Sequence, residues 1–155
     1  MMKNNRLSIL KRIAILIIVV TLVTICNDVT ASETSSRASD YINSYNSYVY
    51  NAAFGKIRVY FDVTGVHYMD DIGALNIKVY ESTDGENWYW VETYSHDSTS
   101  QMLGQDEVYH SGYIEYGGTI GRYYKAYVCI WAGKDGGGDT RYMWTNVKKA
   151  TLLAG

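Results

Sequence analysis

Residues 56–65, KIRVYFDVTG, alternate between apolar side chains and more polar ones. Ile57, Val59, Phe61 and Val63 fall on one side of an extended chain, and the residues between them fall on the other. A period of two is that of a β-strand with one buried face, whereas an amphipathic helix repeats every ~3.6 residues. This stretch therefore predicts a strand that covers a core.

Further segments carry the same signature or a weaker form of it. The chain has 16 tyrosines, four tryptophans and 14 glycines, a composition that favours strands punctuated by turns. The predicted strands are residues 40–51, 56–65, 75–82, 87–95, 106–116, 122–133 and 140–148. We predict an all-β fold after an N-terminal signal helix: a single antiparallel two-sheet sandwich of about seven strands, immunoglobulin-like or fibronectin type III-like.

Residues 1–31 have the pattern of an export signal. Lys3, Arg6, Lys11 and Arg12 precede an apolar run, and a cleavage site is predicted after Ala31. The run covers residues 13–25, shorter than the roughly 20 residues of a spanning helix. A retained membrane anchor and lipidation at Cys26 are the alternatives. We predict a flexible segment at 32–39, the domain at 40–149 and a C-terminal tail at 150–155.

The predicted mature chain is acidic. Four of the 14 basic residues lie in the leader, but only one of the 16 acidic residues does. A net negative chain without a basic block argues against nucleic acid as a partner. Cys129 is the one cysteine after the predicted cleavage site, so no internal disulfide is expected. We expect secretion, with no stable membrane insertion, and the oligomeric state is left open.

Three long connections, 66–74, 96–105 and 134–139, are predicted to meet at one end of the sandwich. Binding residues often lie on loops that a rigid scaffold presents. Asp70, Asp71, Asp135 and Asp139 are candidate calcium ligands there, because calcium takes oxygen donors. His67 and His96, with Asp70 or Asp97, are a weaker zinc candidate. The simpler interpretation of AGKDGGGDTR is a hairpin tip whose glycines take positive φ. A phosphate loop is disfavoured, because a strand rather than a helix follows.

An aromatic row is the other candidate site. Tyr123, Tyr127 and Trp131 share one side of the predicted strand 122–133, and Tyr80 lies on another strand. An exposed row of this kind binds sugar rings or a partner protein. Catalytic signatures such as Gly-x-Ser-x-Gly do not occur, so we expect no enzyme activity and no cofactor beyond the possible calcium.

Two segments resemble parts of fibronectin type III-like modules in bacterial secreted proteins. IKVYESTDGENWYWVETYS (77–95) is similar to a strand–turn–strand unit, and GRYYKAYVCIWAG (121–133) is similar to the sixth strand. That second resemblance implies that Tyr124 occupies the corner between two strands. STDGENW also resembles the Asp-box of sialidases, but it is one residue short and occurs once, so we interpret it as a hairpin.

The chain as a whole resembles an uncharacterised family of small secreted proteins from Gram-positive bacteria. The resemblance rests on FDVTG (61–65), MDDIGALNIKVYESTDG (69–85), YHSG (109–112) and WAGKDGGGDTR (131–141). It implies one exported domain and no known activity. We therefore expect a non-enzymatic binding or adhesion module that contacts an extracellular protein. The alternative is a stand-alone carbohydrate-binding module that uses the aromatic row.

Overall fold

The computed structural model describes residues 39–154, and the predicted signal peptide and residues 32–38 lie outside this range. Its strands are β1 (Ile42–Asn51), β2 (Lys56–Ser82), β3 (Tyr89–Ser95), β4 (Leu103–Gly117), β5 (Tyr123–Lys134), β6 (Gly137–Trp144) and β7 (Lys148–Lys149), with a short 3₁₀ helix at Ser100–Met102. In residues 39–154 there is no helix with the length and apolar character needed to cross a membrane.

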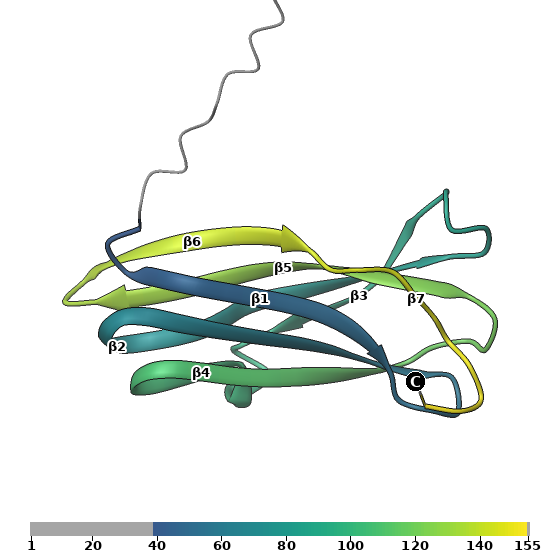
Figure 1. Cartoon of the computed structure of the whole chain (residues 1–155), viewed down its shortest axis with the longest axis horizontal. Helices are drawn as coiled ribbons and strands as arrows, with labels where there is room; N and C mark the ends of the chain where they lie inside the picture. The colour runs from purple at the N-terminus through teal and green to yellow at the C-terminus, as the bar shows by residue number, and fades with distance from the viewer. Residues whose placement is uncertain (1–38, 155) are drawn as a thin grey trace, which may run out of the picture. The chain divides into compact units, whose positions relative to one another are not determined.

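All the strands belong to one antiparallel sheet that curls into a half-barrel (Figure 1). Strand β2 pairs with β1, β3, β4 and β5, and β5 then pairs with β6 and β7. The predicted all-β, antiparallel character is confirmed. The predicted two-sheet sandwich is not confirmed, because the strands join into a single sheet, and the immunoglobulin-like topology stays a prediction.

Strand β2 joins two of the predicted strands and the predicted loop between them. Residues 66–74 were expected to form a loop, and that expectation is wrong: Met69 and Ile72 are buried, and residues 69–73 pair with β4. The pairing shifts between Thr64 and Met69, where β2 bends back on itself at the left of Figure 1. A Cβ on Gly65 would come within 2.8 Å of the His67 carbonyl oxygen, so glycine permits this bend.

The other two predicted loops are also shorter than expected. Residues 96–99 form a turn, and the 3₁₀ helix and the start of β4 take up the rest of 96–105. At 134–139 only Asp135 and Gly136 lie between strands, with φ angles of 51° and 76°. Two central residues with positive φ are what a two-residue type I′ hairpin turn requires. AGKDGGGDTR is therefore a hairpin.

The core lies inside the curl of the sheet. It is mostly aliphatic, and each Val, Ile or Phe side chain that is removed from water contributes roughly 1.5–3 kcal/mol. Its largest fully buried members are Tyr124, Phe61, Ile57, Met69, Ile72, Ile77, Met102 and Ile130. The alternation at 56–65 is confirmed, because Ile57, Val59, Phe61 and Val63 are all buried.

Among residues 39–154, Tyr124 is the one tyrosine that is fully buried. Its hydroxyl accepts the Thr119 backbone N–H at 2.7 Å and donates to the Glu81 carboxylate, which also pairs with Arg122. Burial, together with the bond to Glu81, raises the pKa of Tyr124 to about 12. Tyr124 therefore ties the β4–β5 turn to the end of β2.

The C-terminal residues are bonded to the domain rather than loose. Ala150 is buried, and its N–H and C=O pair with Arg122 and Gly121. Backbone N–H groups of the β1–β2 turn donate to the carbonyls of Thr151 and Leu152 at 3.0 and 2.9 Å. Residues 150–153 of the predicted tail are therefore hydrogen-bonded to the end of β1, the β1–β2 turn and residues 121–122.

Replacing Tyr124 by Phe removes a hydroxyl that satisfies two groups, so we expect a loss of about 1–3 kcal/mol in unfolding free energy at pH 7. The folded protein keeps the tyrosine proton up to about pH 12, whereas an unfolded tyrosine loses it near pH 10. The Tyr124 contribution therefore falls as pH rises from 10 to 12. Urea unfolding across this range should show wild type and Tyr124→Phe converging, and a constant difference would contradict this account.

Candidate binding surface

The outer side of β2, β5 and β6 carries a cluster of aromatic rings. The register places Tyr127 of β5 between Lys78 of β2 and Trp144 of β6, and it places Tyr80 opposite Lys125. Trp90 lies opposite Tyr80 on β3. We call this surface the aromatic face, and its members are Tyr80, Trp88, Trp90, Tyr127, Tyr142 and Trp144.

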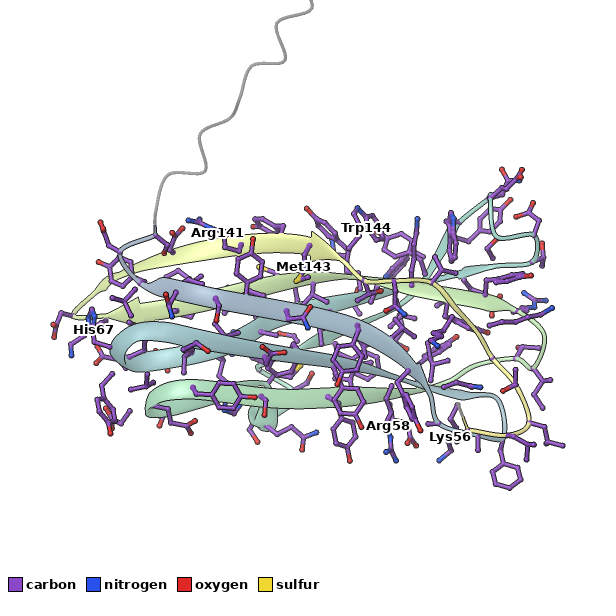
Figure 2. The ribbon with its side chains drawn as sticks, viewed as in Figure 1. Lys56, Arg58, His67, Arg141, Met143 and Trp144 are labelled. Atoms are coloured by element: carbon purple, nitrogen blue, oxygen red, sulfur yellow. The ribbon has the colours of Figure 1, made fainter. Side chains whose placement is uncertain are left out.

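The rings of the aromatic face pack against one another. The Trp144 ring centroid lies 5.1 Å from that of Tyr80 and 4.8 Å from that of Tyr127, and Tyr142 stacks on Tyr127 at 5.7 Å. Such pairs contribute about 0.5–1.5 kcal/mol beyond the area they bury. Trp144 points outward on β6, while its neighbour Met143 packs against the core (Figure 2). The face is therefore formed before any ligand arrives.

Lysine and backbone contacts fix the remaining rings. The Lys125 ammonium lies 4.3 Å from the Trp88 ring centroid and 4.5 Å from that of Trp144, within cation–π range. The Trp90 indole N–H contacts the Glu92 carbonyl at 3.0 Å and the Thr93 hydroxyl at 2.9 Å. Trp90 is still 61% exposed, and a shallow groove of about 280 Å³ opens beside it, lined by Lys78, Tyr80, Trp90 and Thr93.

The structure brings together two of the four predicted ligand-binding residues. Tyr80 and Tyr127 both contact Trp144. Tyr123 lies at the start of β5, where the Lys149 ammonium lies over its ring at 5.1 Å from the centroid. The sequence interpretation missed Trp144 and Tyr142, although their spacing of two in the predicted last strand places them on one side of it.

Trp131, the fourth predicted residue, lies in a separate groove. A Cβ on Gly133 would come within 2.6 Å of the Trp131 indole, and one on Gly138 would also collide with it, so the ring lies close over glycine backbone. The groove has a volume of about 720 Å³. Its polar side chains are Asp71, His96, Ser100, Gln105, Glu107 and His110. The predicted loops 66–74 and 96–105 thus both contribute to it.

The four predicted calcium ligands are not gathered into one site. The Asp70 carboxylate accepts the Asp135 backbone N–H at 2.7 Å, so it anchors the β5–β6 turn. Asp139 forms an ion pair with Arg141, and Asp71 lies in the Trp131 groove. Residues 39–154 contain no group of three or more histidines, cysteines or carboxylates placed to hold a metal ion. The zinc candidates His67, His96, Asp70 and Asp97 therefore do not form such a group either.

The turn STDGEN is satisfied by its own side chains. Asp84 accepts hydrogen bonds from the Asn87 side chain at 2.7 Å, from the backbone N–H groups of Asn87 and Glu86, and from the Ser82 hydroxyl. These bonds hold the pKa of Asp84 well below its usual range, and the bond from the Asn87 side chain has the largest effect. This segment is the β2–β3 hairpin, as predicted. The Asp84 carboxylate already accepts hydrogen bonds from within the turn.

Comparison with known proteins supplies no family. No protein-family model matches the chain, and no curated protein matches it in sequence. The resemblance to small secreted Gram-positive proteins therefore stays a prediction.

Proposed function

We propose that this protein is an exported, non-enzymatic binding module that contacts a protein partner at or outside the cell surface through its aromatic face. The observation that carries the proposal is the contiguous exposure of Trp90, Tyr142 and Trp144, which are 61%, 58% and 48% exposed. Tryptophan and tyrosine dominate the binding energy of protein interfaces. Because packing already holds these rings, little side-chain entropy is lost on binding.

The Tyr124 hydrogen bond and the buried Cys129 thiol both support a binding role rather than a catalytic one. The Tyr124 hydroxyl bonds to backbone five residues upstream, an arrangement that resembles the tyrosine corner of immunoglobulin-like domains. We therefore interpret the half-barrel as an immunoglobulin-like variant, a type of scaffold that commonly presents binding surfaces. Burial raises the pKa of the Cys129 thiol, which opposes a nucleophilic role for this side chain.

The test compares two double variants by chemical cross-linking in culture of the producing cells. Tyr142→Ala with Trp144→Ala removes the centre of the aromatic face and should abolish a specific cross-linked partner. Truncating central interface aromatics typically costs more than about 2 kcal/mol each, or about thirtyfold in affinity. Tyr45→Ala with Tyr68→Ala removes two exposed tyrosines that are not part of the face, and it should leave the cross-link intact.

Two results would overturn the proposal. One is the absence of any specific partner in repeated cross-linking of the wild-type protein. The other is a partner that both double variants retain equally, because that partner would bind elsewhere. Melting curves of both variants establish that a lost cross-link does not reflect unfolding.

The Trp131 groove supports a second candidate, a glycan ligand. Sugar rings stack on aromatic side chains and hydrogen-bond to carboxylates and amides. Trp131 lies beside Asp71, Gln105 and Glu107, and the groove is large enough for one or two sugar rings. This candidate site contains Trp131, one of the four predicted ligand-binding residues, and it lies apart from the aromatic face.

Trp131→Ala should remove retention on cell-wall or plant polysaccharides in affinity electrophoresis, whereas Trp131→Phe should keep part of it. Loss of one stacking ring is expected to cost about 1 kcal/mol or more, which is visible as a several-fold weaker retention. The aromatic-face variant Tyr142→Ala is the matched control and should migrate as wild type does. Unchanged retention of Trp131→Ala would remove the glycan candidate.

A further inference from the structure

The positive charges of the domain are unevenly paired. Residues 39–154 carry 14 aspartates and glutamates but nine lysines and arginines, so this range is acidic. All three of its arginines, together with Lys56, form ion pairs with carboxylates. The other five lysines take part in none of the ion pairs of this range. The places of these lysines therefore show which surface of an acidic domain attracts an anion.

Two of these lysines lie among the rings of the aromatic face. Lys78 of β2 lies opposite Tyr127, and Lys125 of β5 lies opposite Tyr80. The two lysines are thus diagonal neighbours on adjacent strands, a separation of about 7–8 Å. A third, Lys149, flanks the face, where its ammonium lies over the ring at the start of β5. The aromatic face is therefore also the place where positive charge gathers.

The strands of the face supply no carboxylate to balance these lysines. The segments that form the face are 76–80, 88–95, 123–127 and 142–144. Their one acidic residue is Glu92. Glu92 lies opposite Val79, a core residue, so its side chain falls on the other side of the sheet. In agreement, burial and then the charge of Glu92 raise the pKa of Tyr94, which packs against the core.

The β2–β3 turn beside the face adds two carboxylates, Asp84 and Glu86. Asp84 accepts its hydrogen bonds from within the turn. In residues 39–154 neither of the two forms an ion pair with a lysine. The turn therefore does not neutralise the lysines of the face.

The groove beside Trp90 combines a positive charge with apolar walls. It has a volume of about 280 Å³ and is lined by Lys78, Tyr80, Trp90 and Thr93, and we call it the Lys78 groove. The Thr93 hydroxyl accepts the Trp90 indole N–H at 2.9 Å, so its own proton can be donated to a ligand. Lys78 is exposed, and its ammonium is a donor only. Two donors between aromatic rings suit a carboxylate.

The angles between the rings favour a peptide over an acidic sugar. The Trp144 ring meets Tyr80 at 60° and Tyr127 at 44°, so these three rings share no common plane. Tyr142 stacks on Tyr127 at 12°, and the facing sides of these two rings cover each other. A sugar ring stacks on a flat, open ring face. The side chains of a peptide differ in shape and can fill an uneven surface of this kind.

We propose that the aromatic face recognises an acidic segment of its protein partner, with an aspartate or glutamate carboxylate in the Lys78 groove and apolar side chains against Trp90 and Trp144. This inference rests on the proposed function, which makes the aromatic face the partner site. A carboxylate in the groove relieves the repulsion between Lys78 and Lys125. Charge complementarity of this kind also speeds the encounter and fixes the orientation of the partner.

A titration of the purified protein with a random copolymer of glutamate and tyrosine tests the inference, with tryptophan fluorescence as the readout. We expect saturable binding that weakens as salt rises from about 0.05 to 0.5 M, because salt screens exposed charges. Lys78→Gln should weaken binding about fivefold, whereas Lys78→Arg should keep most of it. Lys134→Gln is the matched control: it removes the same charge at the β5–β6 turn and should leave binding unchanged.

Three results of the titration would overturn the inference. One is the absence of binding to the copolymer. Another is an equal loss in Lys78→Gln and Lys134→Gln, because net charge rather than the Lys78 groove would then set the affinity. The third is tighter binding to polygalacturonate than to the copolymer, with loss in Lys78→Gln, because the ligand would then be an acidic sugar.

Photo-cross-linking in culture separates a failure of this inference from a failure of the proposed function. A photoreactive group needs no lysine amine, so Lys78→Gln can be compared directly with the Tyr142→Ala, Trp144→Ala double variant. We expect both to lose the partner. A partner that the double variant loses but Lys78→Gln fully retains would overturn the acidic segment alone. A partner that both retain would overturn the proposed function as well.

Discussion

The bend in β2 is the constraint on which the rest of the domain depends. This strand runs from Lys56 to Ser82, and β1, β3, β4 and β5 all hydrogen-bond to it. Its first half lies between β1 and β4, residues 71–73 lie between β4 and β5, and residues 76–81 lie between β3 and β5. Gly65 permits the close approach at the bend, and Gly73, with a φ of 147°, leaves room for the Met102 carbonyl. Without this bend the sheet would expose one apolar side to water.

Curling divides the side chains into two populations. The inside holds aliphatic residues with Phe61 and Tyr124. Outside lie two clusters of rings, the aromatic face and a cross-strand row of Tyr48, Tyr60 and Tyr113. An aromatic ring on the outer side of a strand shields backbone hydrogen bonds and keeps its polar atom in water. The same placement leaves large apolar surfaces exposed, and surfaces of this kind mark sites of interaction.

The sequence predicted the parts of the fold that keep one periodicity. Residues 56–65 and 122–133 alternate in sequence; β5 lies close to its predicted bounds, and β2 begins at the predicted residue 56 but continues to Ser82. The stretch 66–74 could not be assigned in this way because its buried positions change parity. Val63 and Met69 are odd-numbered, Ile72 and Ala74 are even-numbered, and Ile77 is odd again. The pairing shift between Ala74 and Asn76 accounts for the second of these two changes, and no single-period pattern reveals it.

The candidate sites were predictable to the same degree. Tyr80 and Tyr127 follow from strand parity, but their common neighbour Trp144 depends on the register of β5 with β6, which local sequence does not specify. The four aspartates were predicted to lie together because three long loops were expected to meet at one end of the sandwich. In the folded chain their carboxylates serve other contacts: Asp70 holds the Asp135 N–H, and Asp139 holds Arg141.

Native-state hydrogen exchange on β2 tests the central claim most directly. If one continuous strand unites the half-barrel, the amides of Val59 and Val79 should exchange through the same global opening, with equal dependence on denaturant. That result is expected because neither half of β2 keeps its neighbours when the other half unfolds. If Val79 and its neighbours exchanged through a separate opening of lower free energy while Val59 stayed protected, the two halves would be independent units, and the account would be contradicted.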